Sequence, residues 1–64
     1  MITLKVEASF GVLVKPNFIV ERGDRIGVDP NFKEWIVAPV AGIVREVTFD
    51  DDEHCFIVKL EPFT

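Results

Sequence analysis

Hydrophobic and polar residues alternate along much of this chain. Apolar side chains occupy every second position over residues 2–6, and they do so again over residues 56–60. Successive side chains of a β-strand point to opposite faces, so this alternation is typical of half-buried strands. No window shows the spacing of 3, 4 and 7 that marks an amphipathic helix, and four prolines interrupt the chain. The pattern predicts an all-β domain.

Turn signals divide the chain into short strands. Pro16 and Pro30 each fix φ next to an asparagine, and Gly23 can adopt the positive φ that a tight turn requires. The acidic run 50–53 predicts a solvated hairpin turn rather than a cation site, because the alternating spacing of a calcium-binding loop is absent. We expect strands near residues 2–8, 11–14, 18–20, 25–28, 34–38, 42–49 and 54–60. Seven closely spaced strands favour a sandwich or a small barrel.

The strand expected over residues 42–49 contains a charged exception. Simple alternation places Ile43, Val47 and Phe49 on one face and Val44 on the other. Arg45 then falls on the face of Ile43, where its charge has to reach a sheet edge or a partner.

Length and composition indicate one small domain that benefits from a partner. A chain of 64 residues buries only ~60% of the surface that its unfolded form exposes, which leaves stability marginal. One cysteine, Cys55, cannot form an internal disulfide, and with a single histidine, His54, it cannot build a structural zinc site. Hydrophobic residues nevertheless make up 48% of the chain, including six Phe and one Trp. We therefore expect a dimer or a docking surface for another protein.

Charge and hydropathy disfavour two classes of partner. The net charge is −4, and the nearest approach to a basic cluster is Lys15, Arg22 and Arg25, which we expect to be solvated. Nucleic-acid binding is therefore not expected. No apolar run approaches the ~20 residues of a spanning helix, and the first residues lack the features of a signal peptide. We expect a cytoplasmic protein that does not insert into a membrane.

The inventory for catalysis is thin. The chain has one serine and no tyrosine, and it lacks a Gly-x-Ser-x-Gly motif, a phosphate loop and paired histidines. His54 and Cys55 are adjacent, so on a strand they point to opposite faces and cannot act as a base and a nucleophile together. Cys55 is most simply a core residue. We predict a protein that is not an enzyme and has no catalytic or metal-binding residues.

Two turn motifs resemble those of the biotinyl/lipoyl-like domains. In that family an apolar strand ends in a Gly-Asp turn, seen here in residues 18–26, and an Ala-Pro-x-x-Gly-x-Val turn follows, seen here in residues 36–44. The resemblance covers residues 11–60 and implies a barrel-sandwich hybrid with about seven short strands in two interlocked halves. The residues at its structural turns would be Gly11, Gly23, Asp24, Pro39 and Gly42.

Within this family, the chain is most similar to small modules of redox complexes. It shares a Gly-x-x-x-x-Pro opening, Gly11 to Pro16, with the module in the C subunit of Rnf electron-transport complexes and in the A subunit of sodium-translocating NADH:quinone reductases. Those modules are not known as carriers. Carrier members place a lysine at a hairpin tip, between two Met residues for biotin or after Asp for lipoate. Residues 28–35 contain one lysine, Lys33, with neither flanking pattern.

The function that this combination predicts is a non-catalytic protein-interaction or assembly module. Phe32 and Trp35 beside the expected hairpin would contact a protein partner or a second copy, since exposed aromatic residues often anchor interfaces. The alternative for these aromatic side chains is that they fill the core. A second function is an atypical carrier, biotinylated or lipoylated at Lys33, that serves a separate enzyme. A third is a detached piece of a redox subunit; no other cofactor is expected.

Overall fold

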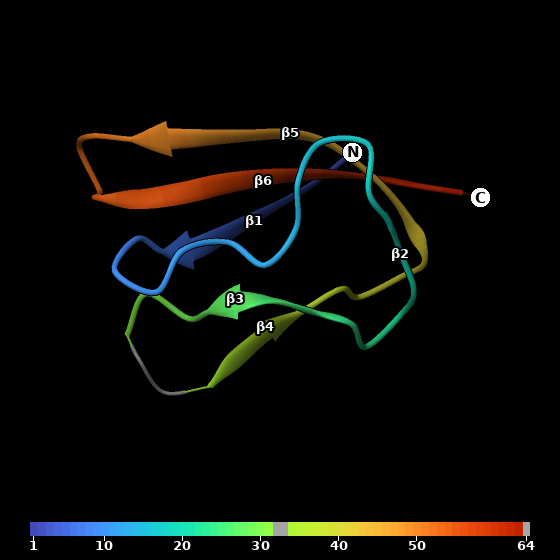
Figure 1. Ribbon diagram of the computed structural model, residues 1–64, viewed down its shortest axis with the longest axis horizontal. Coiled ribbons are helices and arrows are strands. Elements are labelled where there is room, and N and C mark those ends of the chain that lie inside the picture. The colour runs from blue at the N-terminus through green and yellow to red at the C-terminus, as the bar shows by residue number, and fades with distance from the viewer. Residues whose placement is uncertain (32–33, 64) are drawn as a thin grey trace.

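The structure, a computed structural model, describes residues 1–31 and 34–63, and it is all-β (Figure 1). No helix occurs in the described part of the chain. The strands are β1 (Ile2–Glu7), β2 (Ile19–Val20), β3 (Arg25–Val28), β4 (Trp35–Val37), β5 (Gly42–Asp50) and β6 (Cys55–Pro62). The prediction of an all-β domain is confirmed, with six strands found in place of the seven expected.

The strand expected over residues 11–14 is the one that does not form. Gly11 has a φ of +77°, which is outside the range of extended backbone. Leu13 donates one backbone hydrogen bond to the carbonyl of Ile26, at 2.8 Å, and so lies beside β3. The segment thus runs along β3 as a loop, and its inward side chain, Val14, is buried.

Two antiparallel sheets make up the domain. The first has the strand order β1-β6-β5-β2, and the second is the β3–β4 hairpin. In Figure 1 the strands β5, β6 and β1 form the upper part of the molecule, and the β3–β4 hairpin lies below β1, against which both of its strands pack. β2 leaves the large sheet at one end and leads into the hairpin, so the two sheets enclose one core.

The core is aliphatic. Its fully buried side chains come from strands of both sheets, and they are Val6, Ile26, Val44, Val58 and Leu60. No aromatic side chain is buried among the residues that the structure describes, although Phe56 packs against the core. Trp35 is 46% exposed, so the alternative that its side chain fills the core is wrong.

A β-bulge in β5 corrects the faces expected from simple alternation. Val44 pairs with Leu60 and Glu46 pairs with Lys59, which leaves Arg45 as an extra residue. The bulge shifts the alternation by one position, so that Val44 lies on the same face as Val47, whereas simple alternation had placed them on opposite faces. Val44 is buried in the core. Arg45 turns outward instead and donates from Nε to Glu61 Oε1 at 2.8 Å. The hydrogen bond and charge of this exposed pair lower the pKa of Glu61 and raise that of Arg45.

The predicted turns at residues 15–18 and 21–24 are confirmed. Phe18 N–H donates to the Lys15 carbonyl at 3.1 Å, and Asn17 in the third position has a φ of +77°. These are the features of a type II turn with proline in second place. The second turn has the same form, with Gly23 at a φ of +93°, and the Asp24 carboxylate accepts from the Glu21 N–H at 2.8 Å.

The acidic segment forms the predicted hairpin turn between β5 and β6. Asp50 Oδ1 accepts from the backbone N–H of Asp52 at 2.9 Å and of Glu53 at 3.4 Å, which closes the turn. His54 completes it with a φ of +55°. Within the described ranges, no group of three or more His, Cys, Asp or Glu side chains is placed to hold a metal ion.

The two turns behind the family resemblance lie side by side. Gly23 N–H donates to the Ala38 carbonyl at 2.8 Å, and Ala38 N–H donates to the Asp24 carbonyl at 2.8 Å. The Gly23-Asp24 turn is thereby fixed against the residue that precedes Pro39. This contact closes the open end of the β3–β4 hairpin and orients its outer face.

Candidate interaction surface

The outer face of the β3–β4 hairpin presents side chains to solvent. A bulge between Arg25 and Gly27 shifts the β3–β4 register, and both Ile26 and Gly27 are buried. Ile36 packs against the core, and the other four residues of β3 and β4 form what we call the hairpin face: Arg25, Val28, Trp35 and Val37. Trp35 is 46% exposed and Val37 is 42% exposed. An apolar pair of this size is therefore held at the surface by the strand geometry.

The Arg25 guanidinium covers the indole ring of Trp35. The distance from Arg25 Cζ to the ring centroid is 4.6 Å, which is a cation–π contact. Such contacts contribute roughly 0.5–1 kcal/mol at exposed sites. The contact restrains both side chains, so that less rotamer entropy is lost when the face is covered. The large Trp35 side chain is thus held in one place before any partner arrives.

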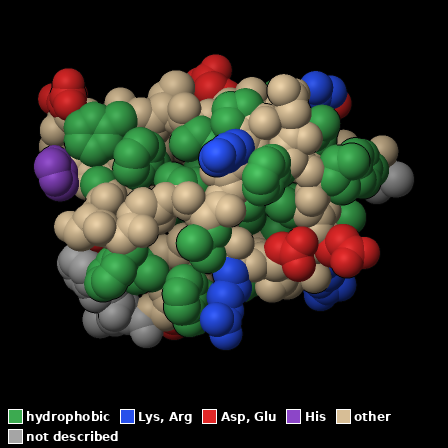
Figure 2. Space-filling model, viewed as in Figure 1, with side chains coloured by type: hydrophobic (Ala, Val, Ile, Leu, Met, Phe, Trp, Pro, Cys, Tyr) green, Lys and Arg blue, Asp and Glu red, His purple; other side chains and the backbone are tan. Residues whose placement is uncertain are grey.

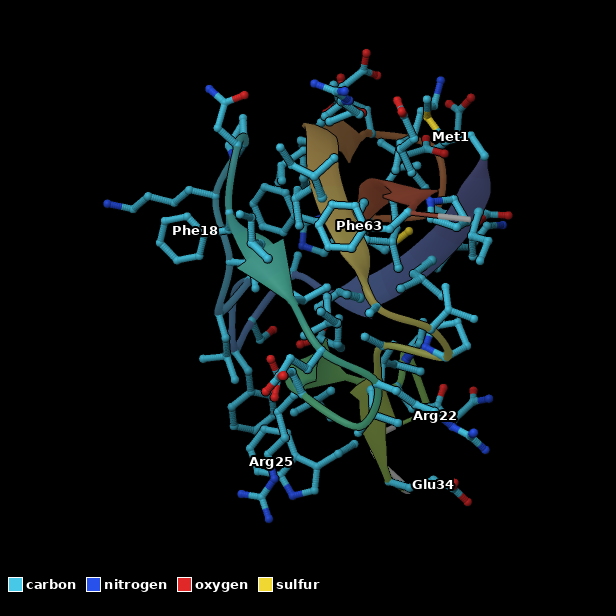
Figure 3. All side chains as sticks on the ribbon, turned by 90° about the vertical axis from the view of Figure 1, so that its right-hand side faces the viewer. Met1, Phe18, Arg22, Arg25, Glu34 and Phe63 are labelled. Carbon is cyan, nitrogen blue, oxygen red and sulfur yellow. The ribbon has the colours of Figure 1, made fainter. Side chains whose placement is uncertain are left out.

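Further apolar groups extend the same side of the molecule. Figure 3 shows that Phe18 and Arg25 project to the same side, which is the side turned to the reader in Figures 1 and 2. Leu13, beside β3, is 54% exposed. Figure 2 shows hydrophobic side chains distributed over this view, with basic and acidic side chains between them. No pocket is found within the described ranges.

Two of the predicted site residues, Phe32 and Lys33, lie outside the described residues. Their predicted roles, in a partner interface and in prosthetic-group attachment, stay predictions. The residues on either side of this loop are joined by a hydrogen bond, in which Asp29 N–H donates to the Glu34 carbonyl at 2.9 Å. Trp35, the third candidate, is on the hairpin face.

The five predicted turn residues have different settings. Gly11 and Gly23 have positive φ values, and Asp24 and Pro39 lie at the joined turns described above. Gly42 instead begins β5, where its register partners are Val20 of β2 and Pro62 of β6. Glycine at this position allows the backbone of β6 to lie close to β5.

Sequence reasoning missed three residues of the hairpin face, namely Arg25, Val28 and Val37. Val37 could have been found from the spacing, because it lies two positions after Trp35 on the same strand face. Arg25 was considered only as part of a scattered basic cluster. Its position over the indole depends on the β3–β4 register and its bulge, for which the sequence has no clear signal.

The thiol of Cys55 and the carboxylate of Glu7 are both buried. Cys55 is 2% exposed, and its burial raises the pKa of the thiol, with a further contribution from the carboxylates of Glu53 and Asp50. The prediction of Cys55 as a core residue is confirmed. Glu7 is also buried, and its Oε2 accepts from the backbone N–H of Ser9 at 2.6 Å and of Phe10 at 3.3 Å. This carboxylate therefore holds the turn that follows β1.

Comparison with protein-family models, curated proteins and solved structures finds no match to the chain. The described residues contain no helix that is long and apolar enough to cross a membrane. Function is therefore inferred from the hairpin face.

Proposed function

We propose that the chain is a non-catalytic protein-interaction or assembly module of the cytoplasm, with a barrel-sandwich hybrid fold of the biotinyl/lipoyl-like type. The hairpin face is its contact surface. The observation that carries the proposal is the exposed indole of Trp35, restrained by the Arg25 guanidinium at 4.6 Å. The adjoining turns at Gly23-Asp24 and Ala38-Pro39 support the fold assignment.

The partial exposure of Trp35 leaves much of its side chain without a stabilising contact within the chain. A small domain gains stability from each large side chain that it buries, yet Trp35 remains 46% exposed. Tryptophan and arginine are enriched among the residues that dominate binding energy at protein interfaces. The aliphatic core is complete without Trp35, so the side chain is available for a partner.

Replacing Trp35 with Ala is expected to weaken association by roughly 2 kcal/mol or more, or about 30-fold, as for an interface anchor. The free energy of unfolding of the isolated chain should fall by only about 1 kcal/mol, because the lost contact is an exposed cation–π pair. Association is measured by quantitative capture from the native cell extract, and stability by urea unfolding.

Phe63→Ala is the matched control. Phe63 is 57% exposed, and Figure 3 shows it away from Arg25, at the end of the molecule that faces the viewer in that figure. The Phe63 variant should retain the captured partner. Equal losses for both variants, or a W35A chain that unfolds, would show that the hairpin face is not a specific contact surface.

A further inference from the structure

The outer edge of β4 has free backbone groups. In an antiparallel ladder, alternate residues of a strand bond to one neighbour, and those between them point away. Glu34 and Ala38 bond to the β3 side, through Asp29 N–H and the Asp24 carbonyl. Ile36, two residues from each, also faces β3, so the N–H and C=O groups of Trp35 and Val37 point outward. No backbone hydrogen bond to this outer edge is found in the part of the chain that the structure describes.

This edge lacks the protection that another edge strand has. β1 also ends a sheet, but Lys5 lies at its centre and is paired with Glu53. A charged residue on an edge strand discourages pairing with a further strand. β4, with the sequence Trp35-Ile36-Val37, carries no charge and no proline, and Figure 1 shows it at the margin of the molecule. Only its short length limits what can pair with it.

We propose that a second copy of this chain pairs with the outer edge of β4, strand to strand and antiparallel about a two-fold axis. Ile36 would lie opposite Ile36 of the second copy, and Trp35 opposite Val37. Because both Trp35 and Val37 direct their backbone groups outward, each such pair exchanges two hydrogen bonds. The inference rests on the proposed function and names the partner of the same hairpin face.

The side chains of the hairpin face suit this register. Val28 pairs with Trp35, and Arg25 pairs with Val37, within one chain. Across the four strands of the paired sheet, one row of side chains would therefore be Val28 and Trp35 of one copy, followed by Val37 and Arg25 of the second copy. The two-fold axis would generate an equivalent row beside it. Pairs of an aromatic and a β-branched residue across strands are favourable. The exposed indole of each copy is then flanked on both sides by valine.

Charge and length favour a second copy over a foreign strand. The two-fold register sets Glu34 opposite Ala38, so that no like charges face each other. The three residues of β4 offer the same few hydrogen bonds to a foreign strand and to a second copy, but the symmetric contact also brings the two hairpin faces together in one four-stranded sheet. An extended peptide from another protein is the competing occupant.

The test uses Val37→Pro, with Val37→Thr as the matched control. Proline lacks the N–H that points outward at position 37, and proline is tolerated on an edge strand when its N–H faces solvent. Threonine keeps the N–H and the β-branch. Sedimentation equilibrium from about 1 μM to about 1 mM covers the range of weak self-association. The native chain and the V37T variant should pass from 7.2 kDa to twice that mass, whereas V37P should dimerise at least about tenfold more weakly.

Amide hydrogen exchange of the unaltered chain is the second readout, which does not depend on how V37P folds. The Trp35 and Val37 amides should be slow to exchange at high concentration and fast on dilution, while the Ile36 amide stays slow. A chain that remains monomeric, or that dimerises with fast exchange at Trp35 and Val37, overturns the pairing. If Trp35→Ala still lowers capture of another protein in that case, the interaction module stands and only its partner changes.

Discussion

Replacing Gly42 with Ala is expected to lower the free energy of unfolding by about 3 kcal/mol or more. A Cβ at this position would lie 2.3 Å from the carbonyl oxygen of Glu61 and 3.1 Å from the Cα of Pro62. Both atoms belong to the backbone of β6, so neither can turn aside as a flexible side chain could. Gly42 pairs with Pro62 in the β5–β6 ladder, and the added methyl group therefore forces these two strands apart. Urea unfolding followed by far-ultraviolet circular dichroism measures the loss.

Gly11→Ala is the control, because it strains the backbone conformation of a glycine without creating a steric clash. Gly11 has a φ of +77°, and nothing lies within 4 Å of a Cβ built there. Alanine at this position is strained only by its backbone, at a cost of about 1–2 kcal/mol. Similar losses for the two variants would contradict the close approach of β6 to Gly42.

Replacing Gly27 with Ala is expected to lower the free energy of unfolding by about 2–3 kcal/mol. The added Cβ would lie 2.2 Å from Val6 Cγ1 and 3.2 Å from the Gly11 carbonyl oxygen. Val6 is fully buried in the core, so its side chain has little room to move. The variant therefore overpacks the contact between the hairpin and β1.

Val6→Ala should relieve part of this clash. Alone, V6A leaves a small cavity, and its cost is expected to be about 2 kcal/mol. Together with G27A it removes the Cγ1 atom that the new methyl group meets. The double variant should then lose about 1 kcal/mol less of the free energy of unfolding than the two single variants lose together. Additive losses, measured by urea unfolding of all four chains, would contradict the contact between Gly27 and Val6.

Local signals predicted much of this fold. The alternation over residues 2–6 and 56–60 corresponds to β1 and β6, and Pro16-Asn17 and Gly23-Asp24 form the expected turns. The error at residues 11–14 arose because a short apolar run looks the same in the sequence in two cases. It can pair with a neighbouring strand through a full set of backbone hydrogen bonds, or it can run beside that strand as a loop held by one hydrogen bond, as Leu13 does here. The face error in β5 arose from Arg45, whose extra position in the register depends on β6.

The candidate site was predicted in part. Trp35 was named as an interface anchor, with a place in the core as the alternative, because turn signals placed it beside a hairpin and tryptophan is enriched at interfaces. Its partner Arg25 lies ten positions earlier in the chain, and the two meet only through the bulged register of β3 and β4. Gly42 was expected at a turn, whereas the structure gives it a steric reason that depends on β6. Such pairings between distant segments have no local pattern.

Site-specific photo-crosslinking in the native cells tests the interaction surface most directly. A photoreactive phenylalanine analogue replaces Trp35 in one strain and Phe63 in another, and the crosslinked products are identified by mass spectrometry. The expected result is a discrete product from position 35, either two copies of this chain or the chain with one other protein, and none from position 63. No discrete product from position 35, or the same products from both positions, would contradict the role of the hairpin face.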